Sequence, residues 1–197
     1  MVIANIFGIL IFLFLFWRTL KDDYHFEKIF NLGFLTIFSV LLSLLLNNFF
    51  PLNYWFWIVL ISASITMFIS AKRTRMKLFE IIEAFSISAL PWLSFYFLED
   101  SIKKSSLSSF LAFWTTLICI FIYFLIKSYY RSFTWYKSGR VGISGILTLL
   151  IFFLFRVVTS LFFPQVISFA GKIEPYLSGS TSLLLIFLMY NLSINKE

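Results

Sequence analysis

Arg156 is the residue whose type and position most strongly indicate chemistry, because it lies deep inside the apolar stretch FFLFRVVTS. A charged side chain within a membrane is costly and usually serves a function. The guanidinium presents a planar set of donors that suits a phosphate group. Arg156 therefore indicates recognition of a phospholipid headgroup.

Glu80 and Glu83 are the other candidates, since they begin the apolar stretch LFEIIEAF. At about 1.5 Å per helical residue, Glu83 lies about 8 Å and Arg156 about 20 Å from the cytoplasmic ends of their stretches. This difference of about 12 Å in height argues against a direct pair between straight helices. Arg156 instead lies about 10 Å from the outer boundary of a bilayer core about 30 Å thick, and an arginine side chain can reach most of that distance.

Structural interpretations of these charges remain open. Arg156 could bond to backbone carbonyls or to neighbouring Tyr and Ser side chains. Glu80 and Glu83 follow a basic segment at the start of a stretch, where a helix dipole favours acidic side chains.

Other reactive residue types indicate no separate site. His25 is the only histidine and lies in a charged loop, and Cys119 is the only cysteine, so neither a histidine-based metal site nor an intrachain disulfide is expected. No nucleotide-binding loop or zinc signature is present, so we expect no cofactor and no metal. The mixed aromatic and basic segment 127–137 is more typical of a membrane interface than of nucleic-acid binding.

Composition identifies the elements that must position these residues. The 197-residue chain is 60% hydrophobic and 13% charged, with a mean hydropathy of +0.94. Soluble domains are about 45–50% apolar and about 25% charged. We therefore predict one all-α integral membrane bundle over residues 1–197. The expected spans number about seven: 2–17, 30–46, 54–70, 78–98, 107–126, 143–163 and 177–192.

The basic residues predict an orientation. Of the 16 Lys and Arg residues, twelve fall in the odd-numbered loops and the C-terminal tail, three fall in the even-numbered loops, and Arg156 lies within a span. The positive-inside rule then puts the N-terminus outside and the C-terminus in the cytoplasm. Gly139, Gly142 and Gly145 are spaced by three, which predicts close helix packing rather than a phosphate loop.

Taken together, these stretches resemble the prolipoprotein diacylglyceryl transferase family. AKRTRMKLFEIIEA is similar to the family's basic loop and next helix, with Glu83 at a usual acidic position. GRVGISGILTLLIFFLFRVVTSLFFP is similar to its sixth span, with Arg156 at the family's arginine. The resemblance implies a multi-pass protein of the bacterial inner membrane. It also implies transfer of diacylglyceryl from phosphatidylglycerol to a prolipoprotein cysteine, with phospholipid and prolipoprotein as partners.

Most of the family's signature residues are replaced. The histidine and two glycines of its third span fall on Trp57, Ile58 and Val59, and its glutamate one turn after the arginine falls on Ser160. Arg156, Glu83 and Ser160 are thus the candidates for headgroup binding, and no catalytic set is assigned. The sequence leaves three functions open: a degenerate or rearranged transferase, a non-enzymatic lipid- or partner-binding protein, and a small permease.

Overall fold

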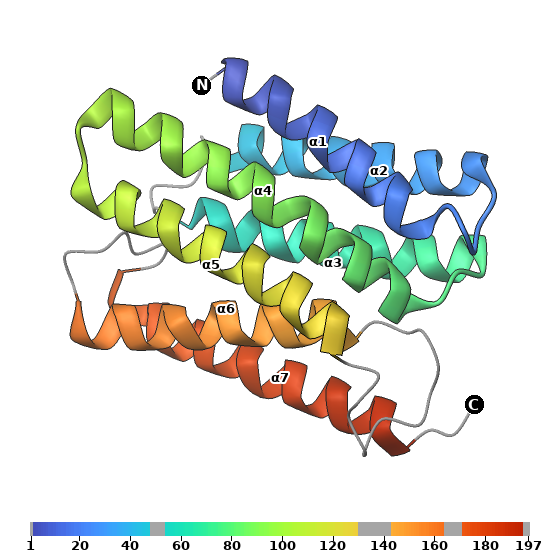
Figure 1. Cartoon of the computed structure of the whole chain (residues 1–197). Coiled ribbons are helices and arrows are strands. Elements are labelled where there is room, and N and C mark those ends of the chain that lie inside the picture. The colour runs from blue at the N-terminus through green and yellow to red at the C-terminus, as the bar shows by residue number, and fades with distance from the viewer. Residues whose placement is uncertain (1, 48–53, 130–142, 164–170, 195–197) are drawn as a thin grey trace.

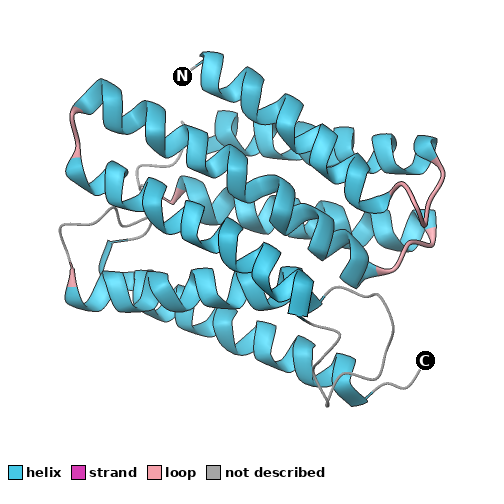
Figure 2. Ribbon diagram, viewed as in Figure 1, coloured by secondary structure: helices cyan, strands magenta, loops and turns pink. Residues whose placement is uncertain are grey.

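The structure, a computed structural model, describes residues 2–47, 54–129, 143–163 and 171–194. These residues form α-helices, with short turns at 21–25, 75–77 and 105–106, one 3-10 turn (η2, Gly171–Ile173) and no strand among them (Figure 2). The helices are α1 (Val2–Leu20), α2 (Phe26–Asn47), α3 (Trp55–Thr74), α4 (Leu78–Lys104), α5 (Leu107–Tyr129), α6 (Ile143–Phe162) and α7 (Glu174–Ile194).

Each predicted apolar stretch overlaps one of these helices, because a long apolar run in lipid can satisfy its backbone only within a helix or a closed barrel. Five helices, α2 to α6, are long and apolar enough to cross a membrane. The all-helical class and the compatibility with a multi-pass membrane protein are therefore confirmed for the described residues. The predicted glycines Gly139 and Gly142 lie outside the described residues.

Successive helices run in opposite directions, so the bundle has two distinct ends (Figure 1). We call the end that holds the turn between α3 and α4, with Lys72, Arg73 and Lys77, the basic end. The other end, which holds the starts of α3, α5 and α7, is called the far end. α4 lies at the centre and packs against α1, α3, α5 and α6, while α2 packs with α3 and α6 packs with α7.

Two glycines allow α4 to approach its neighbours closely. A Cβ on Gly8 of α1 would lie 2.1 Å from Cδ1 of Trp92, and one on Gly145 of α6 would lie 2.5 Å from Cα of Glu83. Neither helix could take its observed position with a larger residue there. The prediction of close packing is confirmed at Gly145.

The buried side chains form two clusters. One contains residues of α1, α2, α3 and α4, lies toward the basic end, and includes Phe16, Met67 and Ile81. The other contains residues of all five helices from α3 through α7 and includes Trp57 and Phe153. The candidate site lies in this second cluster.

Candidate functional site

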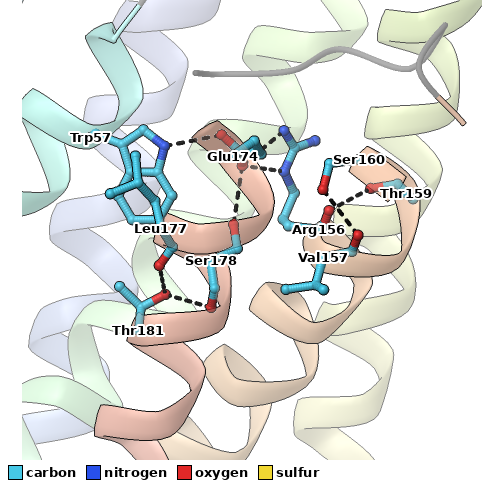
Figure 3. Close-up of polar contacts among 9 residues, drawn as sticks. All are labelled: Trp57, Arg156, Val157, Thr159, Ser160, Glu174, Leu177, Ser178 and Thr181. Carbon is cyan, nitrogen blue, oxygen red and sulfur yellow. Dashed lines mark hydrogen bonds and ion pairs between the residues drawn. The ribbon is translucent and has the colours of Figure 1, made fainter. Parts of the chain in front are cut away.

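Arg156 forms an ion pair with Glu174 inside the bundle (Figure 3). Its Nε and Nη2 donate to Oε1 of Glu174 over 3.2 and 3.1 Å. The two side chains are only 7% and 0% exposed. A charged pair this deeply buried is stable only when both partners stay in place and are well hydrogen-bonded.

Two further donors complete the bonding of the Glu174 carboxylate. Nε1 of Trp57 donates to Oε2 over 3.0 Å, and Oγ of Ser178 donates to Oε1 over 3.1 Å. Trp57 comes from α3, Arg156 from α6, and Glu174 and Ser178 from α7, so one carboxylate joins three helices (Figure 3). The buried charge therefore also determines how these helices sit against one another.

Local sequence explains why Glu174 begins a helix at this point. Gly171 has a positive φ of 56°, which a glycine adopts without strain, and it opens the turn before α7. Pro175 follows Glu174, and proline is favoured in the first turn because that turn has no partner for its missing N–H. An acidic side chain there is also stabilised by the helix dipole.

The structure does not bring Glu83 to Arg156. Glu83 lies beside Gly145 on α6, and Arg156 follows eleven residues later, or about 16 Å further along the helix. Ser160 is one turn beyond Arg156, is partly buried, and donates to the carbonyl of Val157 in its own helix over 2.9 Å. A headgroup role for the three residues stays a prediction.

Glu83 belongs to a separate polar group near the basic end. The hydroxyl of Tyr123 donates to Oε1 of Glu83 over 3.1 Å, and Nζ of Lys127 donates to the same hydroxyl over 3.3 Å. Nearby, the Tyr24 hydroxyl donates to Oε2 of Glu80. Burial and this hydrogen bond raise the pKa of Tyr24, in the turn between α1 and α2, to about 12.

Asp100 and Cys119, two other reactive side chains, are both buried in the bundle. Asp100, buried at the end of α4, accepts a hydrogen bond from Ser109 Oγ over 2.6 Å and forms an ion pair with Lys104 over 2.7 Å. Cys119 is a buried free thiol in α5. Among the described residues no cluster of His, Cys, Asp or Glu could hold a metal ion.

Glu174 is the residue that sequence reasoning missed. Its signal was present, because an arginine inside an apolar stretch can be balanced by an acid at the same height, and Glu174 begins the helix that directly follows that of Arg156. From the sequence, only Glu83 was compared with Arg156, and their difference in height argued against a direct pair. What was lacking was the neighbour relationship between α6 and α7.

A partly open cavity of about 390 Å³ lies beside the second buried cluster, between α1, α2, α3, α4 and α6. Its walls are mainly aromatic and aliphatic, and none of the described side chains that line it is a Lys, Arg, Asp, Glu or His. Four of its polar side chains take part in hydrogen bonds within the protein. Trp92 donates to Asn5, Thr36 donates to the carbonyl of Leu32, and Ser86 donates to the carbonyl of Glu83.

Comparisons of the chain with protein-family models, curated proteins and solved structures find no match. A function must therefore be inferred from the cavity and from the polar group around Arg156 and Glu174.

Proposed function

We propose that the chain is a multi-pass protein of the bacterial inner membrane that spans the bilayer seven times. In this arrangement the N-terminus is outside, the C-terminus is cytoplasmic, and the basic end faces the cytoplasm. The positive-inside pattern supports the orientation, and the packing of α1 against α4 and of α7 against α6 supports including both in the membrane. The bacterial location follows from the family resemblance.

We further propose that the protein binds the acyl chain of a membrane lipid, without converting it chemically. The observation that carries this proposal is the apolar cavity of about 390 Å³, which falls in the usual size range for small-molecule sites. The apolar walls offer water few hydrogen-bond partners, so water binds weakly in the cavity. An acyl chain gains about 0.8 kcal/mol of binding free energy for each methylene that it buries there.

The position and length of the cavity fit one leaflet of a bilayer. Along α4 it extends over the twelve residues from Phe85 to Tyr96, a helical rise of about 16 Å. On α3 it is lined only near the far end, by residues between Trp55 and Leu60. Half of a hydrocarbon core is about 15 Å thick. The cavity therefore matches an acyl chain of the outer leaflet.

The alternative of diacylglyceryl transfer is less well supported by this geometry. Transfer requires a cation for the phosphate leaving group and a base for the thiol. The charge of Arg156 is balanced by Glu174, and the Glu83 group lies toward the opposite end of the bundle. A lipidation assay in a transferase-depleted bacterium tests this alternative directly: labelled lipoprotein would establish it and replace the binding proposal.

Binding is tested by filling the cavity. Ala89 lines it, so Ala89→Phe places a ring inside, whereas Ile118→Phe adds a ring on the lipid-facing surface of α5. The purified protein in nanodiscs is photolabelled with a phosphatidylglycerol that carries a diazirine on one acyl chain. We expect wild type and Ile118→Phe to be labelled at residues such as Leu90 and Phe152, and Ala89→Phe to lose those adducts.

Two outcomes would contradict the proposal. Adducts confined to outward-facing residues would mean that the acyl chain does not enter the cavity. If cavity residues were labelled as strongly in Ala89→Phe as in wild type, the adducts would not depend on the acyl chain occupying the cavity. Flux of small solutes into liposomes, measured on the same preparation, would instead favour a permease.

A further inference from the structure

The seam between α3 and the α6–α7 pair differs from the other helix contacts of the bundle. Among the described residues α3 packs along α2 and touches α4, but it is not closely packed against α6 or α7. Large side chains bridge the gap instead. Trp57 stacks on Phe153 with ring centroids 5.8 Å apart, and Phe56 reaches Phe152 and Phe153 at 6.2 and 6.4 Å.

One hydrogen bond crosses this seam between described side chains, from Nε1 of Trp57 to Oε2 of Glu174. The acceptor is held in place by Arg156 and Ser178, so it is a fixed point on α6 and α7. The donor is the third residue of α3, at the far end of that helix.

The other half of α3 is anchored differently. Ala63, Met67 and Ala71 are buried in the cluster that joins α1 to α4 toward the basic end. The α2–α3 pair is therefore held by close packing at one end and by rings and a hydrogen bond at the other. The cavity lies between these two attachments, and Phe56, Phe152 and Phe153 belong both to its wall and to the seam.

We propose that the seam is the lateral entrance through which an acyl chain reaches the cavity, and that the Trp57–Glu174 hydrogen bond is the latch that keeps it closed. This rests on the proposed lipid binding. Opening requires only that the far end of α3 moves away from α6 and α7, which breaks that bond and separates the aromatic rings. The close packing at the basic end stays intact and acts as the hinge.

The experiment measures the rate of lipid exchange rather than its affinity. Protein loaded with chain-deuterated phosphatidylglycerol is mixed with an excess of the unlabelled lipid, and native mass spectrometry follows the change in bound mass. Trp57→Phe keeps an aromatic ring against Phe153 but removes the N–H. We expect exchange to become about tenfold faster or more, because a hydrogen bond to a charged acceptor contributes at least that factor.

The matched control is Ser182→Ala. It removes one buried hydrogen bond, to the carbonyl of Ser178, but that bond lies within α7 and involves neither Glu174 nor the seam. We expect its exchange rate to stay close to that of wild type. Phe153→Leu is a second test that leaves the bond in place and loosens the ring contact, and it should also speed exchange. It serves if Trp57→Phe does not fold.

The two levels of the proposal fail differently. If wild type retains no lipid, the proposed function is wrong. If wild type retains lipid but neither Trp57→Phe nor Phe153→Leu exchanges it faster than Ser182→Ala, the binding stands and the latch is overturned.

Discussion

Replacing Glu174 by glutamine gives the sharpest test of how the bundle is held together. The glutamine would keep the shape of the side chain and an acceptor for Trp57 or Ser178. It would remove the negative charge that faces the guanidinium of Arg156, whose side chain is only 7% exposed. The substitution therefore leaves a buried cation without its counter-charge.

The expected magnitude follows from this burial. Removal of one partner from a buried ion pair costs about 3–5 kcal/mol, because the remaining charge is neither solvated nor balanced. Loss of one hydrogen bond to the charged carboxylate, as in Ser178→Ala, costs about 1.5–3 kcal/mol. In the double variant Arg156→Met with Glu174→Gln the unbalanced charge is gone, so we expect it to be more stable than Glu174→Gln alone.

The free energy of unfolding would be measured by SDS titration in mixed micelles, with helix content followed by circular dichroism. A buried ion pair predicts a strongly non-additive cycle between Arg156 and Glu174. This prediction would be refuted if Glu174→Gln cost no more than Ser178→Ala, or if the double variant were destabilised by the sum of the two single changes.

Three further predictions follow from local geometry. Gly145→Ala would press a Cβ against the backbone of Glu83, so we expect a loss of about 1–3 kcal/mol in the same titration, while Gly179→Ala, with open space at its Cβ, should be neutral or stabilising by up to about 1 kcal/mol. Ser105→Gly should stabilise by about 1 kcal/mol, because Ser105 has a φ of 48° at the end of α4; unchanged or lower stability would contradict this. The raised pKa of Tyr24 makes its stabilising effect fully present below pH 10, and the effect is lost toward about pH 12 as the unfolded chain ionises first. Tyr24→Phe should therefore flatten that decline in unfolding free energy, and an unchanged slope would count against it.

The helices could be predicted because each depends on its own segment. A long apolar run must satisfy its backbone locally in lipid, so stretches such as 30–46 and 107–126 coincide with α2 and α5. The separation in height between Glu83 and Arg156 was also predictable, since it needs only the rise of a helix and the ends of each span.

The partner of Arg156 and the cavity could not be read in the same way. Pairing with Glu174 depends on which helices are neighbours and on how each is rotated, and neither is fixed by the pattern within one segment. The cavity depends on side chains from five helices that fail to fill a space between them. Both properties come from packing between segments far apart in the sequence.

The pairing of Arg156 with Glu174 has a consequence for how the protein is made. The two residues are separated by 18 positions, so the carboxylate is synthesised about 1–4 s after the guanidinium. A nascent α6 that entered lipid alone would carry an uncompensated charge during that interval. We therefore expect the insertion machinery to retain α6 until α7 emerges, so that the two helices enter the bilayer together with Arg156 and Glu174 already paired.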